Sequence, residues 1–142
     1  MSIAQIKPYF SSKLTALGYE EWPDGFGEDN IPSTILDLSF HQRFIRASGG
    51  PVNQESFEML VNHQIKFYLK GFNDPASAID QGLVQSQSII AEILNLSDYT
   101  TAGIKGLFFD SFTVEPLDEV QNDNIIVATL NFNILVFNCI SV

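Results

Sequence analysis

The chain has 142 residues, a hydrophobic content of 45%, a charged content of 17% and a formal net charge of −10. This length predicts a single domain, residues 1–142, with enough chain to bury one core. The charge argues against a surface built to hold nucleic acid, because phosphate binding needs clustered lysine and arginine and only seven are present. The thin charged coat over an apolar composition favours a protein that assembles.

The first segment has apolar residues at helical spacing. Ser2 and Gln5 have the spacing of a capping box, and Gly18 is suited to a C-terminal stop. Pro8 either kinks this helix or marks its true first turn. The expected buried stripe consists of Ile3, Ile6, Phe10, Leu14 and Leu17.

Residues 19–33 are rich in glycine, proline and acidic side chains and are expected to form a loop. Within them, residues 20–29 carry five carboxylates and no base. Trp22 and Phe26 lie in this acidic stretch. Large aromatic side chains in a polar loop either fold back onto the core or are presented to a partner, and the sequence leaves both alternatives open.

Two runs of alternating residues follow and predict a hairpin. The first begins at residue 35, and residues 47–56 supply turn chemistry for a long connection to the second. The expected core-facing residues are Leu36, Leu38, Phe40 and Phe44 in the first run, and Val61, Ile65, Phe67 and Leu69 in the second. The opposite face is expected to carry Asp37, Ser39, His41 and Arg43, and Lys66, Tyr68 and Lys70.

Residues 73–97 predict a second helix, capped by Asn73 or Asp74 and with Pro75 in its first position. Its expected apolar face is Ile79, Leu83, Ile90, Ile93 and Leu94. Strands at 107–115 and 125–137 complete the chain. The predicted fold class is α+β, in the order α-β-β-α-β-β, with a four-stranded antiparallel sheet and two helices packed on one face.

The last strand is apolar on both sides. Its even positions from Ile126 to Val136 fit a core face, but Ile125, Val127, Leu135 and Phe137 on the odd positions are apolar as well. A sheet with helices on one side normally carries polar residues on the other. A long loop, a helix or a neighbouring subunit must cover the second face, and we favour a neighbouring subunit.

Candidate chemistry is sparse. The two histidines, His41 and His63, would approach each other only in a suitable register, and a zinc site would need Asp37 or Glu58 as a third ligand. Cys139 is alone, so it offers no intramolecular disulfide. Paired carboxylates occur only in polar segments and are interpreted as solvated. We therefore assign no catalytic, cofactor-binding or metal-binding residue.

Targeting signals are also missing from the sequence pattern. The first ten residues have neither a continuous apolar segment nor a small-residue cleavage pattern, so we expect no secretion. The longest apolar stretch, residues 125–137, is interrupted by Thr129, Asn131 and Asn133 and is too short for a helix that crosses a membrane. The expectation is a chain that folds in a cytoplasm and has no membrane partner.

Three phrases together resemble a known family. They are a capped helix ending in "LGY" before a strand after "IPS", the segment "QIKFYLKGFNDPASAID", and the strand pair "FFDSFTVEPLDEVQNDNIIVATLNFNILV". Over nearly the whole chain the sequence resembles the tail terminator (tail completion) proteins of long-tailed bacteriophages and prophages, the minor tail protein U type. The phrases are patterns of hydrophobicity and turn residues and contain no catalytic signature.

The resemblance implies a structural virion protein that is not an enzyme and has no cofactor. Such proteins assemble in the host bacterial cytoplasm as a hexameric ring on the head-proximal end of the tail tube. The ring stops tube polymerisation and joins the tail to the head connector, so the implied partners are further copies of the chain, the tail tube protein and the connector, with DNA passing non-specifically. Alternatives are another phage neck or baseplate component, or a small ligand-binding α+β domain.

A ring needs two different complementary patches on each subunit. Four of the seven basic residues lie between positions 43 and 70, apart from the acidic segments. The candidate subunit or tube interface consists of Trp22, Phe26, Arg43, Arg46, Pro51, Val52, Leu135 and Phe137. A candidate acidic loop that faces the lumen or a partner carries Asp118, Glu119 and Asp123.

Overall fold

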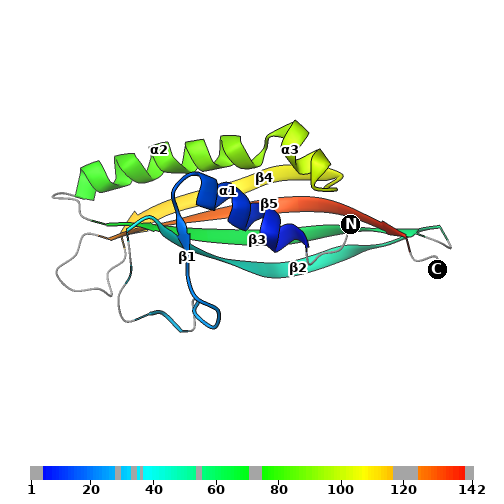
Figure 1. Ribbon diagram of the computed structural model, residues 1–142, viewed down its shortest axis with the longest axis horizontal. Helices are drawn as coiled ribbons and strands as arrows, with labels where there is room; N and C mark the ends of the chain where they lie inside the picture. The colour runs from blue at the N-terminus through cyan, green and yellow to red at the C-terminus, as the bar shows by residue number, and fades with distance from the viewer. Residues whose placement is uncertain are drawn as a thin grey trace.

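A long sheet with helices on one side forms the framework of the computed structural model (Figure 1). The structure describes residues 5–27, 30–32, 35, 37–53, 56–70, 75–116 and 125–139, and of these the side chains of 51–53, 56–57, 75 and 137–139 are not described. The elements are α1 (Ile6–Ala16), β1 (Glu20–Glu21), β2 (Ser39–Asn53), β3 (Ser56–Leu69), α2 (Pro75–Ile93), α3 (Leu96–Thr101), β4 (Gly106–Pro116) and β5 (Ile126–Cys139).

The sheet has five strands in the order β1-β2-β3-β5-β4. The four long strands pair antiparallel, and the short β1 pairs parallel with the start of β2. The α+β class is confirmed, but the sheet is mixed and carries three helices where the sequence predicts an antiparallel sheet and two. The extra strand lies in the predicted loop, where the N–H groups of Glu20 and Trp22 donate to the carbonyls of Leu38 and Phe40, both at 2.8 Å.

The extra helix, α3, arises where the second helix was predicted to continue. The α2 helix ends at Ile93, and the Asn95 side chain then caps a new helix by accepting from the N–H of Asp98 at 3.1 Å. An asparagine N-cap satisfies one of the free donors of the first turn, so it starts a new helix rather than prolonging the old one.

The hairpin of β2 and β3 also differs from its prediction. The β2 strand begins at Ser39 instead of residue 35, after Leu38 with a φ of 55°, a left-handed conformation that interrupts an extended strand. Residues 47–53, predicted as a connection, continue β2 and pair with β3 as far as Asn53 opposite Ser56. A register shift between Phe44 and Arg46 leaves Ile45 as the extra residue of a bulge.

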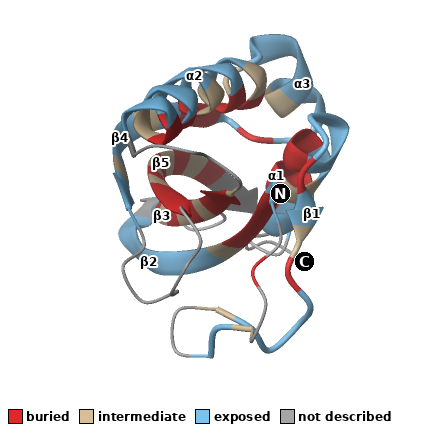
Figure 2. Cartoon of the chain, turned by 90° about the vertical axis from the view of Figure 1, so that its left-hand side faces the viewer, coloured by how far each residue is buried: buried red, intermediate tan, exposed pale blue. Residues whose placement is uncertain are grey.

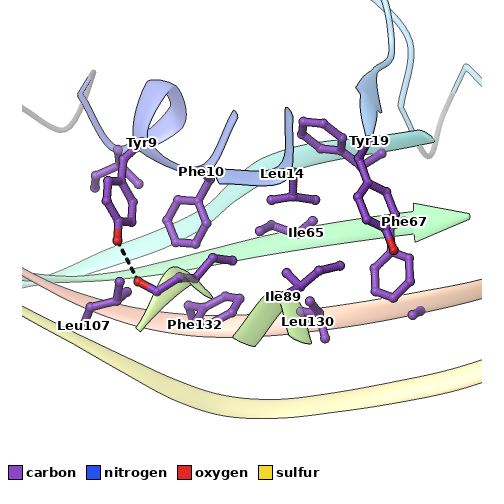
Figure 3. Close-up of a cluster of buried hydrophobic side chains, with 14 of the residues drawn as sticks. Tyr9, Phe10, Leu14, Tyr19, Ile65, Phe67, Ile89, Leu107, Leu130 and Phe132 are labelled. Carbon is purple, nitrogen blue, oxygen red and sulfur yellow. Dashed lines mark hydrogen bonds between the residues drawn. The ribbon is translucent and has the colours of Figure 1, made fainter. Parts of the chain in front are cut away.

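The main core lies between the helices and the inner face of the sheet (Figure 3). Phe10 from α1 lies with its ring centroid 4.9 Å from that of His63 and 5.3 Å from that of Phe132. The Tyr9 hydroxyl donates to the Ile93 carbonyl at 2.7 Å, which ties α1 to α2. The predicted core positions of the last strand are all buried, namely Ile126, Ala128, Leu130, Phe132, Ile134 and Val136.

The first helix matches its predicted stripe at Ile6, Phe10 and Leu14, whereas Leu17 is exposed. Pro8 is the third residue of α1 and therefore lies in the first turn, one of its two expected places. Gln5 is the N-cap residue and makes no side-chain capping bond. The predicted capping partner Ser2 and the core residue Ile3 lie outside the described residues.

The buried face of α2 agrees in part with its prediction, because Ile93 is buried and Ile79, Ile90 and Leu94 pack against the core. Leu83 is 44% exposed, and the residues that face the sheet are Ala78, Gly82, Ser86, Ile89 and Ile93. A Cβ atom added to Gly82 would lie 2.6 Å from Val114 Cγ1. Small residues let the helix approach β4 closely, so Gly82 and Ser86 belong to the buried stripe together with the large side chains of Ile89 and Ile93.

Candidate functional site

The side of the sheet that faces away from the helices, here called the outer face, is the candidate site. It contains the odd-numbered positions of β5, and the apolar residues among them led us to expect that something covers this face. Figure 1 shows the helices on the opposite side, and the segment between β1 and β2 below one end of the sheet. We call this the loop end and the opposite end, near the β2–β3 turn, the hairpin end.

The loop end is covered by the chain itself. Trp22 is 7% exposed and stacks on Tyr68 with ring centroids 4.8 Å apart, and its indole N–H donates to Ser39 Oγ at 3.0 Å. The Trp22 and His41 centroids are 4.4 Å apart, and His41 Nε2 lies 2.9 Å from the Tyr68 hydroxyl. Beneath them, a second core cluster consists of Trp22, Ile35, Tyr68, Ile125 and Val127. Of the two alternatives for Trp22, the structure shows that it folds back.

The middle of the outer face carries paired amides. Asn62 Nδ2 donates to Asn133 Oδ1 at 2.8 Å, and Gln64 Nε2 donates to Asn131 Oδ1 at 3.0 Å. Asn131 then donates to Ser111 Oγ at 3.3 Å, which extends the row from β3 across β5 to β4. These polar groups satisfy one another, so this belt can face water without a cover.

The hairpin end is apolar, and among the described residues none covers it. Register places Leu60 on β3 opposite Leu135 on β5, and Phe108 on β4 opposite Asn133. Phe108 is 54% exposed, Leu60 is also exposed, and Leu135 is half-buried. We call Leu60, Phe108 and Leu135 the hairpin-end patch.

A hollow of about 320 Å³ adjoins this patch and is lined by Ser48, Gly49, Gly50, Glu58, Met59, Leu60 and Leu135. It exists because β2 carries small residues here. Gly49 has a φ of +146°, and a Cβ atom on it would lie 2.2 Å from the Glu58 carbonyl oxygen, so no other residue fits this backbone. The hairpin end thus combines exposed apolar side chains with a cavity that has room for a further group.

Charge divides the outer face by strand. Register places Arg43, Arg46 and Lys66 on its β2 and β3 side, where the Glu58 carboxylate pairs with Lys105. On the β4 side, Glu115 occupies an outer-face position and Asp110 lies exposed at a bulge. The described part of this surface is therefore basic along β2 and β3 and acidic along β4, as the distribution of charge along the sequence suggested.

The segment that covers the loop end also presents an aromatic side chain. Phe26 is 38% exposed, at a turn closed by its N–H bond to the Pro23 carbonyl at 3.2 Å. Gly25, with a φ of +91°, supplies the left-handed conformation, and Asp24 beside it is exposed. We call residues 23–27 the Phe26 turn. Trp22 therefore folds back onto the sheet, whereas Phe26 stays exposed.

A polar network on the inner face holds the buried His63. Its Nε2 lies 2.7 Å from Gln42 Oε1, and the Gln42 amide donates to Glu21 Oε2 at 2.9 Å, to Ser11 Oγ at 2.7 Å and to the Lys7 carbonyl at 3.2 Å. Burial, helped by the charge of Lys7, lowers the pKa of His63 to about 4. His63 is thus neutral at pH 7 and joins β3 to α1 and β1.

Lys13 is a buried charged residue that ties the helices together. Its ammonium pairs with Glu92 at 3.3 Å and with Asp98, which joins α1 to α2 and α3. Burial works against the charged form of Lys13, but the hydrogen bonds that its ammonium donates to both carboxylates prevail and raise its pKa. Burial also raises the pKa of Tyr9 to about 12. Both groups therefore stay protonated at pH 7 and serve the helix layer.

The two histidines lie on opposite faces of the sheet, so the histidine pair considered from the sequence does not form. His41 lies opposite Lys66 in the strand register and its ring contacts Trp22, whereas the His63 ring contacts Phe10. Asp37 accepts from the Lys70 N–H at 2.8 Å, and Glu58 pairs with Lys105. Within the described residues no group of three or more His, Cys, Asp or Glu side chains could hold a metal ion.

The remaining predicted site residues are distributed as follows. Arg43 and Arg46 are exposed on outer-face positions, and Leu135 belongs to the hairpin-end patch. Pro51 and Val52 lie in β2 and Phe137 in β5, but their side chains are not described. The acidic residues Asp118, Glu119 and Asp123 lie outside the described residues. The sequence analysis did not identify Leu60 and Phe108 as candidate interface residues. A signal for Phe108 exists, because two consecutive phenylalanines in a strand, Phe108 and Phe109, must lie on opposite faces of the sheet.

Comparisons with known proteins add no family: no protein-family model matches the chain, and no curated protein matches its sequence. Among the helices that the structure describes, none is long and apolar enough to span a membrane. The function proposed below therefore rests on the outer face of the sheet.

Proposed function

We propose that the chain is a ring-forming structural subunit of a phage tail, of the tail terminator type. The observation that carries the proposal is the hairpin-end patch, where Leu60, Phe108 and Leu135 stay uncovered although the chain covers the loop end of the same face. An exposed apolar patch with polar residues beside it is typical of a surface that another protein covers. The chain uses the patch to contact a neighbouring subunit.

The sheet supports assembly in a second way. The β2–β3 hairpin is paired along its whole length and extends beyond the helices at the end opposite the loop (Figure 1). A long hairpin that leaves the helix layer offers a rigid surface to a neighbour or to the end of a tail tube. In the proposed ring it contacts the tube protein, while the opposite side of the ring docks to the head connector.

The charge fits a ring through which DNA passes. With a net charge of −10, the subunit repels a phosphate backbone, so DNA slides through the lumen and is not retained. The basic residues of β2 and β3 then serve contacts between proteins. Strong retention of DNA by the protein at physiological salt would contradict this role.

The test is the mass and shape of the purified protein. Light scattering from micromolar to millimolar concentration, with negative-stain imaging, is expected to show a six-fold ring with a hole of tube size. Added to tail tubes that still polymerise, the protein is expected to stop their growth at one end. A compact monomer at every concentration that leaves tube growth unchanged would contradict the proposal, and saturable binding of a metabolite would favour a ligand-binding domain instead.

A further inference from the structure

We infer that the Phe26 turn of one subunit docks into the hairpin-end hollow of the next, so that the outer face carries both halves of a head-to-tail contact. The inference rests on the proposed function, because it names the partner of the hairpin-end patch as a second copy of this chain. Its two halves are the exposed Phe26 ring with the neighbouring Asp24, and the hollow with Arg46 nearby on the same face.

The hollow suits an aromatic side chain. Its apolar wall is Leu60 and Leu135, its floor is the glycine pair Gly49 and Gly50, and about 320 Å³ of space lies between them. Pockets that hold organic groups combine apolar walls with a few polar atoms at the edge, and here Ser48 and Glu58 supply those atoms. Filling this hollow would also cover part of the hairpin-end patch.

A basic side chain, Arg46, lies near the hollow, and the carboxylate of Glu58, which lines it, pairs with Lys105. Arg46 on β2 lies opposite Asn62 on β3, two residues before Ser48, which lies opposite Leu60. The Arg46 side chain is exposed. An arginine at this distance can lie over an aromatic ring that enters the hollow and can pair with a carboxylate beside that ring.

The Phe26 turn has the complementary chemistry. Phe26 is 38% exposed, Asp24 beside it is exposed, and the same stretch of sequence continues with Glu28 and Asp29. An exposed aromatic side chain beside the Asp24 carboxylate matches an apolar hollow with Arg46 nearby, and such complementarity sets the pairing and orientation of an interface.

The turn cannot reach the hollow of its own chain. Phe26 lines a separate hollow of about 280 Å³ with His41 and Arg43, near the loop end. From Arg43 to Ser48 a strand rises by about 16 Å, at about 3.3 Å per residue. The two surfaces therefore lie at different places on one face, and a contact between them must join two copies. A head-to-tail contact of this kind closes a ring when its rotation repeats a whole number of times around an axis, as the proposed function requires.

The experiment uses two full-length variants and their mixture. Phe26→Ser removes the aromatic anchor, and Ser48→Tyr fills the hollow, while each leaves the other surface intact. Each variant alone is expected to weaken self-association at least tenfold, as measured by sedimentation. The 1:1 mixture is expected to form a species of two chains and nothing larger, because one intact turn and one intact hollow remain per pair. Association of the wild type is expected to weaken with salt.

Controls separate a lost contact from a lost fold. Val84→Ser changes an apolar residue that is 55% exposed on α2, on the helix side, and is expected to leave self-association unchanged. Circular dichroism checks the fold of each variant, and Leu60→Ser replaces Ser48→Tyr as the hollow variant if tyrosine is not accommodated.

The outcomes also separate this inference from the proposed function. If the wild type forms rings and both variants assemble equally well, the docking of Phe26 is wrong while the ring proposal stands. A mixture that contains only single chains likewise shows that the two surfaces do not meet. If the wild type stays monomeric to millimolar concentration and does not stop tail tubes, the proposed function fails and this inference fails with it.

Discussion

The two ends of the outer face are built from the same strands but are covered differently. At the loop end, Trp22 covers Tyr68 and Val127, and the second core cluster forms within the chain. At the hairpin end, Leu60 and Phe108 remain exposed (Figure 2 shows burial along the chain). The apolar odd-numbered positions of β5 therefore serve two different purposes. One end belongs to the fold of the subunit, and the other, in our proposal, belongs to its assembly.

This difference predicts the largest effect at the loop end. Trp22→Ala removes the stacking on His41 and Tyr68 and the bond to Ser39, and it is expected to lower the free energy of unfolding by about 4 kcal/mol. Urea unfolding of the dissociated subunit measures this change. Phe26→Ala, four residues away in the same segment, is the matched control and is expected to cost less than about 1 kcal/mol. Equal costs would mean that Trp22 does not close this end.

The second prediction concerns the inner face. His63 has a pKa of about 4 in the folded protein and about 6.5 when unfolded, so the unfolded chain takes up the proton first as the pH falls. Stability from this residue is therefore complete above pH 6.5 and is lost progressively down to pH 4, by about 3 kcal/mol in total. His63→Phe is expected to flatten the dependence between pH 6.5 and 4 while lowering stability at pH 7, because Gln42 loses its partner. An unchanged slope in urea unfolding across this range would contradict the buried neutral histidine.

The amide belt between the two ends should have an intermediate role. Asn62→Ala removes the bond to Asn133 in a half-buried position and is expected to cost about 1 kcal/mol in urea unfolding. The cost is small because water can replace the lost partner. A loss as large as that of Trp22→Ala would mean that the belt belongs to a closed core and that a cover extends over the middle of the face.

The smallest effect on the isolated subunit is expected at the hairpin end. Phe108→Ser changes a side chain that is 54% exposed, so the free energy of unfolding of the dissociated subunit should change by less than about 1 kcal/mol. The same substitution is expected to weaken self-association at least tenfold in sedimentation. If Phe108→Ser instead unfolds the subunit and leaves assembly intact, the hairpin end is part of the fold.

The sequence predicted the α+β class, the four long strands and the inner face of β5, because period-two alternation over many residues is a strong local signal. It missed β1 because two acidic residues carry no such pattern, and the backbone bonds from Glu20 to Leu38 and from Trp22 to Phe40 that accompany this strand leave no mark in the sequence. On α2 it was wrong only for Leu83, but it missed Gly82 and Ser86, which are buried for their small size and add nothing to hydrophobicity.

The site was predictable only in part. The apolar odd positions of β5 showed that the outer face needs a cover, but which end the chain covers depends on how the segment after β1 closes in three dimensions. Trp22 and Phe26 look alike in the sequence, and only the stacking on Tyr68 separates them. The hollow depends on the register that places Ser48 and Gly50 beside Leu60, which a bulge at Ile45 sets.

The most direct test of the account is hydroxyl-radical footprinting of side chains in the assembled and the dissociated protein. We predict that oxidation of Phe108 and Leu60 falls at least several-fold on assembly, while oxidation of Val84 on α2 stays the same and Trp22 is protected in both states. An assembled protein in which Phe108 and Leu60 react as fast as in the dissociated subunit would contradict the claim that a neighbouring copy covers the hairpin end.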